Sequence, residues 1–314
     1  MLIVNPHATS TTPLRRDVIA RALASELDLT VVQTRYRGHA AHFAGEAAQD
    51  GYELVLTLGG DGTVNEAVNG LLRAFPPDAG GPEARPALAA LPGGSANVFT
   101  RALGMPSDAV DATGRLLAAL TGGGCRTIGV GLAQDRYFTI NAGLGIDAEV
   151  VRAIEGLRAD GQEASAGLYV WTAIRHFYGV INRRQPALAL ELNGRPAARR
   201  LFFAIVSNAA PWTYLGSRPV NPSPEAGFNT GLDVFAARTM GTLPTLGMLR
   251  YMLGIGPGGP GANAEPRHIL SLHDEHELAF RAIRPVAFQV DGEYVGEREH
   301  VTFRSVPDAL RVIS

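Results

Sequence analysis

Hydrophobic and polar positions follow two patterns along this chain, one in its first third and another after it. In the first third, short apolar runs alternate with segments whose apolar residues recur every three to four positions, which predicts strands that alternate with helices. Such alternation is typical of a parallel sheet with helices packed on it. The predicted strands are Leu2 to Val4, Leu29 to Thr34, Glu53 to Leu58 and Ala87 to Leu91.

Capping residues indicate where the helices begin. Thr12 is predicted to be an N-cap with Pro13 in the first turn. Thr63 and Glu66 have the spacing of a capping box, which predicts a helix start after the third strand. Ser95 is predicted to cap a further helix. The first helix is predicted to bury one face, formed by Leu14, Val18, Ile19, Ala22 and Leu23.

The pattern changes after Gly122-Gly123-Gly124, a predicted linker, because short strands dominate from there on. Their spacing predicts an antiparallel β-sandwich. One helix is predicted among them, over Ala166 to Asn182. The apolar segment Leu243 to Ile255 predicts either a helix packed on the sandwich or an interfacial segment that touches a membrane or a lipid tail. The predicted strands are Arg136 to Asn141, Ala187 to Asn193, Arg199 to Ser207, Leu232 to Ala237, Arg267 to His273, Glu277 to Ala282, Val286 to Asp291 and His300 to Arg304.

Composition narrows the class of protein. The 314 residues are 46% hydrophobic and 18% charged, as in a globular protein. A formal net charge of -2 gives no general attraction to nucleic acid. No apolar run reaches the length of about 18 residues that a membrane-spanning helix needs. The single cysteine, Cys125, excludes an internal disulfide and a cysteine-built zinc site, and it fits a reducing compartment.

The chain contains no lysine, so all 28 basic residues are arginine. A Walker-type phosphate loop requires a lysine, and this kind of site is therefore excluded. Any bound triphosphate must be held by backbone N–H groups, hydroxyl groups, arginine and a metal ion.

Polar and glycine-rich segments follow each of the four predicted strands. Because ligands of parallel α/β sheets bind beyond the carboxyl ends of the strands, these segments are predicted to meet at one edge. The third segment holds Asp61 between glycines, which are predicted to take positive φ and to approach a ligand closely. A following helix N-terminus suits phosphate. The four segments are Asn5 to Thr9, Thr34 to Gly38, Gly59 to Thr63 and Pro92 to Ser95.

The segment Gly59-Gly60-Asp61-Gly62-Thr63-Val64-Asn65-Glu66 resembles the nucleotide signature of the diacylglycerol kinase catalytic family. That family includes bacterial soluble lipid kinases, ceramide kinases and sphingosine kinases, and is distantly similar to NAD kinases and phosphofructokinases. Further matches follow in the expected order along nearly the whole chain. They are Asn5-Pro6, Leu91 to Asn97, Asn141 to Asp147 and Asp291-Gly292-Glu293.

The resemblance implies two domains. Residues 1–124 would form an α/β ATP-binding domain of the NAD kinase and phosphofructokinase type, and residues 125–304 a β-sandwich that carries the lipid site. Residues 305–314 would pack back onto the first domain.

The resemblance also implies the residues that contact ATP, and it places Mg²⁺ at Asp61. Two departures from the family pattern concern this site: the first loop reads Asn-Pro-His-Ala-Thr, and Val98 stands where an aspartate is common. Asn5 and Asn97 have an alternative interpretation as residues that only hold turns together. The matching positions are Asn5, Pro6, His7, Ala8, Thr9, Thr34, Gly59, Gly60, Asp61, Gly62, Thr63, Val64, Asn65, Gly94, Ser95 and Asn97.

Phosphoryl transfer also needs a base that faces the acceptor hydroxyl. The resemblance places this base at Glu293, although a carboxylate at either Asp291 or Glu293 suits the chemistry. The local sequence alone favours an ordinary Asp-Gly hairpin turn, and the ordered family match favours the catalytic role.

Bacterial members of the family have a second, structural Mg²⁺ site beside an Asp-Gly-Leu-Leu-Asp-like segment. The corresponding stretch here is Asn229 to Asp233, in which Asn229 replaces an aspartate. One negative charge fewer weakens a site for a hard cation, so no metal ligand is predicted there.

Gly143-Leu144-Gly145-Ile146-Asp147-Ala148 follows a predicted strand and imitates a dinucleotide-binding fingerprint. It lies outside the region of alternating strands and helices, and a lone match of this kind is weak. No dinucleotide site is predicted there.

The function that the resemblance implies is ATP-dependent transfer of the γ-phosphate to a lipid hydroxyl, by a cytoplasmic protein that visits the inner membrane surface. Two alternatives stay open: an NAD kinase-like enzyme with a soluble substrate, and a non-catalytic regulator that binds nucleotide or lipid. The sequence does not name the acceptor, which is diacylglycerol-like or sphingoid-like. Sheet edges offer one route to a homodimer.

Overall fold

A computed structural model of the chain describes residues 1–159, 172, 185–255 and 268–314. The chain divides into two compact units, and the second unit is inserted in the first. Unit 1 comprises Met1–Val130 and Val306–Ser314, and unit 2 comprises Gly131–Ser305. The helix predicted over Ala166 to Asn182 lies outside the described residues, Thr172 apart.

Unit 1 is built on a parallel sheet with the strand order β2-β1-β3-β4. Leu58 pairs with Val4 on one side and with Leu91 on the other, so the carboxyl ends of three strands lie level. The last residues of β16 add a further parallel strand, with Val312 opposite Leu88. The bounds are β1 Leu2–Val4, β2 Val31–Gln33, β3 Leu54–Gly59, β4 Ala87–Pro92 and β16 Glu293–Ile313.

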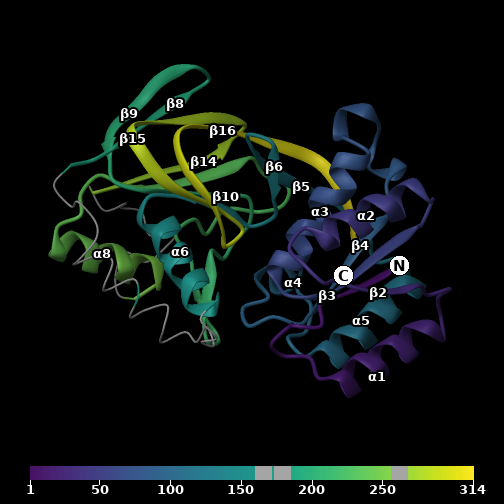
Figure 1. The fold of residues 1–314 in the computed structure, drawn as a ribbon. Helices are drawn as coiled ribbons and strands as arrows, with labels where there is room; N and C mark the ends of the chain where they lie inside the picture. Colours follow the sequence, from purple (N-terminus) through teal and green to yellow (C-terminus); the bar gives the residue numbers. More distant parts are fainter. Residues whose placement is uncertain (160–171, 173–184, 256–267) are drawn as a thin grey trace. The chain divides into compact units, whose positions relative to one another are not determined.

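Helices cover both faces of this sheet, α2 and α3 on one side and α1 and α5 on the other (Figure 1). The buried strand residues and the apolar helix faces form the core of the unit. The bounds are α1 Pro13–Ala24, α2 His39–Gln49, α3 Asp61–Ala74, α4 Val98–Ala102 and α5 Ala109–Gly122, with short 3-10 helices over Pro77–Ala79 and Pro82–Ala84.

The first helix begins as predicted, but it buries a narrower face. Thr12 is the N-cap, and its hydroxyl oxygen accepts a hydrogen bond from the Arg15 N–H at 3.3 Å. Ile19 and Leu23 are buried, whereas Leu14 is 74% and Val18 48% exposed. The apolar stripe was thus wrong for the first turns of the helix.

The predicted capping roles of Thr63, Glu66 and Ser95 were wrong. Helix α3 begins earlier, with Gly60 as its N-cap, and α4 begins later, after Asn97. Glu66 instead accepts hydrogen bonds from the N–H groups of Gly38 (2.7 Å) and Ala40 (3.1 Å) at the start of α2. The carboxylate therefore satisfies the N-terminus of a neighbouring helix rather than of its own.

The described part of unit 2 consists mainly of antiparallel strands, together with the helices α6 (Ile146–Ala159) and α8 (Thr242–Met252). A separate pair, β11 (Thr213–Leu215) and β12 (Arg218–Val220), forms a small ladder of its own. Strand β5 (Cys125–Ala133) begins in unit 1 and ends in unit 2. The other strands are β6 Arg136–Phe138, β7 Asn141–Leu144, β8 Leu188–Leu192, β9 Arg195–Leu201, β10 Ala204–Ser207, β13 Leu232–Ala237, β14 Ile269–Glu275, β15 Glu277–Val290 and the first part of β16.

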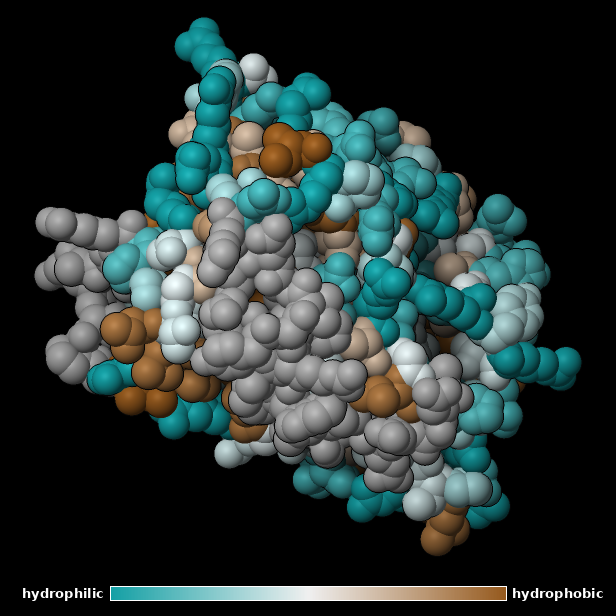
Figure 2. Space-filling view, turned by 60° about the vertical axis from the view of Figure 1, so that its left-hand side comes forward, coloured by the Kyte–Doolittle hydropathy of each residue, from teal (hydrophilic) through white to brown (hydrophobic). Residues whose placement is uncertain are grey.

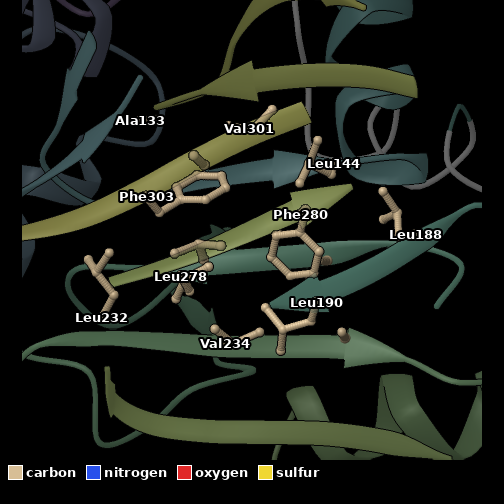
Figure 3. Packing of buried hydrophobic residues seen from close by; sticks show 14 of the residues in the cluster. Ala133, Leu144, Leu188, Leu190, Leu232, Val234, Leu278, Phe280, Val301 and Phe303 are labelled. Atoms are coloured by element: carbon tan, nitrogen blue, oxygen red, sulfur yellow. The ribbon is translucent and has the colours of Figure 1, made fainter. Parts of the chain in front are cut away.

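The long strand β15 changes partners along its length. Residues 278–282 pair with β8, and residues 288–290 pair with β7. Both sets of strands therefore face one core, in which the rings of Phe138, Phe280 and Phe288 meet the ring of Phe303 edge to face (Figure 3). The predicted combination of an α/β domain and an antiparallel β domain is confirmed.

Some hydrophobic residues lie on the surface, as the brown areas of Figure 2 show. In α8, Leu243 is 79%, Leu246 56% and Leu249 47% exposed, whereas Met248, Tyr251 and Met252 are buried. The helix thus packs on the unit through one face and presents leucines on another. Across the described ranges, none of the helices is long and apolar enough to span a membrane.

The contact between α2 and α3 depends on Gly70, because a Cβ there would lie 2.1 Å from the carbonyl oxygen of Ala41. We expect Gly70→Ala to lower the free energy of unfolding by about 1–3 kcal/mol, since backbone atoms cannot move aside cheaply. Gly114→Ala in α5 is the matched control, because a Cβ there meets no atom within 4 Å. It should raise stability by up to about 1 kcal/mol. Urea denaturation of both variants tests the prediction, and equal effects would contradict it.

Candidate functional site

Two glycine turns face each other at the carboxyl ends of β3 and β4. A Cβ on Gly93 would lie 2.9 Å from the Cα of Gly59, and a Cβ on Gly94 would lie 2.7 Å from the Cα of Gly60. The Gly93 N–H also donates a hydrogen bond to the Gly59 carbonyl oxygen at 2.8 Å. The turns therefore touch backbone to backbone, a contact that leaves no room for side chains.

The glycines of the third segment do not take positive φ, so this prediction was wrong. Gly60 has φ −89°, and neither Gly59 nor Gly62 lies in the left-handed region. The left-handed residue near the turns is Asn97, with φ 48°. Glycine is needed here because level parallel strands bring their following turns into contact.

Two asparagine side chains fasten the turns. Asn97 accepts a hydrogen bond from the Gly94 N–H (2.8 Å) and donates one to the Gly94 carbonyl oxygen (2.7 Å). Asn5 accepts from the His7 N–H (3.0 Å) and donates to the hydroxyl oxygen of Thr63 (3.2 Å). Both amides hold the loops in place, which is the alternative role considered for them from sequence.

Asp61 is the first residue of α3, and its carboxylate reaches the next helix. One carboxylate oxygen accepts a hydrogen bond from the Phe99 N–H at 2.9 Å, in the first turn of α4. The side chain therefore ties two helix N-termini together. A carboxylate at this position also lowers the positive potential that two helix N-termini create.

A hollow of about 720 Å³ opens between the first two post-strand segments. Its volume is in the usual range for small-ligand sites. On one side of it, the ring of His39 stacks between Tyr36 (4.3 Å between centroids) and Phe43 (4.1 Å). The lining residues are Pro6, His7, Val32, Gln33, Thr34, Arg35, His39 and Phe43.

The residues predicted to contact ATP fall into three groups. Pro6, His7 and Thr34 line the hollow, and the other loop residues lie at or beside the glycine turns. The side chains of Val64 and Asn65 are 1% exposed inside α3, so only their backbone is near the turn. Hydrogen bonds connect three of the four post-strand segments. The Asn5 side chain donates to Thr63, and the N–H of Ser10, directly after the first segment, donates to the Gly93 carbonyl oxygen.

In unit 2, the Asp291 carboxylate is surrounded by donors. One oxygen accepts from the N–H (2.7 Å) and hydroxyl (2.9 Å) of Thr139, and the other from the N–H groups of Ile140 (2.9 Å) and Asn141 (3.0 Å). Four donors saturate the acceptor capacity of a carboxylate. Asp291 therefore anchors the turn between β15 and β16 to the segment that leads into β7.

Glu293 follows this turn at the start of β16 and forms an ion pair with Arg136 of β6. Both side chains are largely shielded, with 17% and 19% exposed. A guanidinium beside a carboxylate favours its ionised form. Sequence reasoning missed Arg136, because nothing in the local sequence of a short strand reveals a partner 157 residues away.

Sequence reasoning also missed Asp147 and Gln289, which form a buried pair behind the turn. The Gln289 side-chain N–H donates to Asp147 at 2.6 Å and to the side-chain oxygen of Asn141 at 2.9 Å. Burial raises the pKa of Asp147 to about 6, against the lowering effect of the Gln289 hydrogen bond. The matching segment Asn141 to Asp147 was the available signal for Asp147.

The segment considered for a second Mg²⁺ site contains one acidic residue, Asp233, whose carboxylate already contacts other groups of the protein. Asp233 is buried, and its carboxylate contacts the Nδ1 atom of His273 (2.7 Å) and accepts from the Asp274 N–H (3.2 Å). Burial raises the pKa of Asp233, and the Asp274 and His273 contacts oppose this. This donor set does not fit a hard cation. The described residues contain no cluster of three or more acidic, histidine or cysteine side chains that could hold a metal ion.

The comparisons with known proteins agree with this geometry. Residues 1–131 match the family described as diacylglycerol kinase catalytic domain. This match covers less than half of the chain. This match ends where unit 2 begins, so it covers the glycine turns and the hollow and leaves the acidic turn outside.

The chain is similar to named bacterial proteins over part of its length. It is 41% identical over 114 residues to a diacylglycerol kinase from Bacillus subtilis (strain 168), covering 36% of this chain and 33% of that protein. It is 36% identical over 141 residues to a protein named "Probable lipid kinase YegS-like" from Chromohalobacter salexigens, covering 45% and 42%. The matched region thus spans less than half the length of these two relatives.

Solved structures share the fold over nearly the whole chain. A diacylglycerol kinase structure from Bacillus anthracis str. Sterne has a TM-score of 0.71 at 20% identity, covering 99% of this chain and 95% of that one. An NAD kinase from Archaeoglobus fulgidus in complex with ATP has a TM-score of 0.51 at 11% identity, covering 100% and 92%. These likenesses show a fold common to both kinds of kinase.

The raised pKa of Asp147 has a consequence for stability that a variant can isolate. The carboxyl binds its proton more tightly in the native state than in the unfolded state, so its contribution is present below about pH 4 and is lost as the pH rises to about 6. Asp147→Asn carries no charge at any pH. We expect the stability of the wild type relative to this variant to fall by about 3 kcal/mol between pH 4 and pH 7.

Urea denaturation of both proteins across this pH range measures the difference. All other titrating groups are common to the two proteins and cancel. A difference that stays constant with pH would contradict the prediction.

Proposed function

We propose that this chain is an ATP-dependent lipid kinase, which transfers the γ-phosphate of ATP to a lipid hydroxyl. The observation that carries the proposal is the pair of facing glycine turns beside a hollow of about 720 Å³, within residues that match the diacylglycerol kinase catalytic domain. The names of the relatives in Bacillus subtilis and Chromohalobacter salexigens support a lipid as the acceptor.

In this proposal the nucleotide binds to unit 1. The hollow lined by Pro6, His7 and Thr34 suits the nucleoside, and the turn at Gly59 to Thr63 suits the phosphates. Gly60 caps α3 without a side chain, so the first turn of the helix is open to an anion. Asn5, Ala8, Thr9, Gly94, Ser95 and Asn97 complete the proposed ATP contacts through their loops.

Asp61 is the proposed contact for Mg²⁺. Magnesium in kinase sites commonly takes one or two carboxylates and completes its shell with water and phosphate oxygens. A single loop carboxylate at the phosphate-binding turn fits that donor set. The ion, when bound, would neutralise charge on the phosphates, and Asp61 would orient it while still tying α3 to α4.

Glu293 is the proposed general base. It takes the proton from the acceptor hydroxyl as the oxygen of that hydroxyl forms a bond to the γ-phosphorus, while the bond from this phosphorus to the β–γ bridging oxygen breaks and ADP leaves. The Arg136 guanidinium pairs with Glu293 and directs its carboxylate. Asp291, whose four acceptor positions are filled, has a positioning role in this scheme rather than that of the base.

Transfer of labelled γ-phosphate from ATP to a mixed lipid extract tests the proposal. We expect the wild type to label a lipid, and Glu293→Gln to lower kcat by about 10²–10⁴-fold, because an amide cannot accept the proton. Glu299→Gln is the matched control, because Glu299 is an exposed acid on the same strand. It should keep full activity.

The other outcomes each point to a definite alternative. Label transferred to NAD rather than to lipid would support the NAD kinase-like function. ATP binding without any transfer would support a non-catalytic regulator. Undiminished transfer by Glu293→Gln would remove Glu293 as the base.

We also propose that α8 is the contact of this kinase with the lipid surface, where its acceptor lies. The exposed leucines Leu243, Leu246 and Leu249 recur at helical spacing. Residues 234–255 contain no acidic side chain but include Arg238 and Arg250, both exposed. The exposed Arg218 is held at the end of α8, where it donates to the Leu253 carbonyl oxygen at 3.0 Å. Leucine with nearby arginine complements an anionic bilayer.

Sedimentation with vesicles of phosphatidylglycerol and phosphatidylcholine tests this surface. We expect the triple variant Leu243→Gln, Leu246→Gln, Leu249→Gln to bind at least about tenfold more weakly, because three apolar side chains no longer enter the bilayer. The control is Leu14→Gln with Val18→Gln, which alters exposed apolar residues of α1. Equal binding by the two variants would contradict the role of α8.

A further inference from the structure

The segment Gly143 to Asp147, which imitates a dinucleotide fingerprint, has a different use in the structure. Gly143 of β7 lies opposite Gln289 of β15 in the antiparallel ladder. A Cβ on Gly143 would lie 1.7 Å from a carboxylate oxygen of Asp147 and 2.9 Å from the side-chain nitrogen of Gln289. The space over Gly143 is therefore filled by the side chains of these two residues. Glycine at this position makes their contact possible.

The Gln289 side chain connects this buried space to the acidic turn. Its N–H group donates to Asp147 (2.6 Å) and to the Asn141 side-chain oxygen (2.9 Å). Its oxygen accepts a hydrogen bond from the Gly292 N–H at 2.8 Å. Gly292 lies between Asp291 and Glu293, so Gln289 adds a second hold on the turn besides the contacts of Asp291 with Thr139 to Asn141.

The orientation of the Gln289 amide is set by its partners. Two oxygens, from Asp147 and Asn141, face its nitrogen, and one N–H, from Gly292, faces its oxygen. A flipped amide would place oxygen against two oxygens and a donor against a donor. Gln289 is 1% exposed, so water cannot replace a lost partner without entering the core.

The turn that this amide holds is a two-residue Asp-Gly hairpin loop, in which both residues have positive φ. Asp291 and Gly292 both lie in the left-handed region, with φ of 47° and 76°. A non-glycine residue there is strained and persists only when its surroundings fix it. The contacts of the Asp291 carboxylate and of the Gly292 N–H hold this backbone in place. They therefore determine the position of Glu293, the first residue of β16.

We propose that Gln289, oriented by Asp147, is a positioning residue that fixes the turn from which Glu293 reaches the acceptor hydroxyl. The role for catalysis rests on the proposed kinase function, whereas the hold on the turn does not. The Asp147 carboxylate acts through other groups. It orients the Gln289 amide, and this amide holds the Gly292 N–H. The backbone at Gly292 then determines the position of Glu293.

Hydrogen exchange of the peptide that covers residues 288–295 tests the hold on the turn without any need for activity. We expect Gln289→Met to speed exchange at the Gly292 N–H at least tenfold, because methionine fills the same volume but offers no acceptor of comparable strength. Val234→Ala is the control for general destabilisation, since Val234 is fully buried in β13. It should leave this peptide unchanged relative to the rest of unit 2. Unchanged exchange in Gln289→Met, or the same local change in both variants, would overturn the proposal.

A pair of substitutions tests the orienting role of Asp147. Gln289→Glu places a carboxylate against Asp147 and should loosen the turn in the same exchange experiment. Adding Asp147→Asn supplies an amide that can donate to the new carboxylate, so the double variant should recover at least half of the lost protection. A double variant that is no better protected than Gln289→Glu alone would overturn the orienting role.

Lipid phosphorylation by the same variants tests the link to catalysis. We expect Gln289→Met to lower kcat at least tenfold while the KM for ATP stays unchanged, because the proposed ATP contacts lie in unit 1. A loss in which the KM for ATP rises and kcat does not change would overturn the link. If the wild type transfers no phosphate, the kinase proposal fails by itself, and the exchange result still decides whether Gln289 holds the turn.

Discussion

The carboxylate of Asp291 is the contact on which the candidate site of unit 2 depends. It accepts four hydrogen bonds from three consecutive residues, Thr139 to Asn141, and so fastens the β15–β16 turn to the strand that leads away from β6. A left-handed aspartate is strained by roughly 1 kcal/mol or more, and these bonds offset the strain. The same turn directs Glu293, the proposed base, toward Arg136.

Unit 1 depends on close contact between the backbones of its turns. The parallel register brings the ends of β3 and β4 level, and the following glycines touch. Asn5, Asn97 and Asp61 then join the loops by hydrogen bonds, which makes the proposed phosphate site a rigid assembly of several loops. In each unit the carboxylate of one motif residue, Asp61 or Asp291, accepts hydrogen bonds from the backbone. These contacts determine the shape of each candidate site.

Much of the fold could be predicted from local pattern. The strand over Leu232–Ala237 and the Thr12 cap were placed correctly, because apolar runs and a capping residue before proline carry their information within a few residues. The prediction of a capping box at Thr63 and Glu66 was wrong, although the two residues have the spacing of such a box. Glu66 instead accepts hydrogen bonds from two N–H groups at the start of another helix, α2. Local propensity gave way there to a contact between elements.

By itself the sequence determined the order of strands and helices, the two-part architecture and the motifs that mark the family, since these depend on spacing along the chain. Only the tertiary structure decided what the motif residues do. Asp291 and Glu293 are both acidic, so the sequence does not distinguish their roles. Their partners, Thr139 and Arg136, lie 152 and 157 residues away along the chain. The role of Asp147 likewise depends on its hydrogen-bond partner Gln289, which lies 142 residues further along the chain. Hydrogen bonds form between groups that folding brings together, and spacing along the chain does not encode which groups those are.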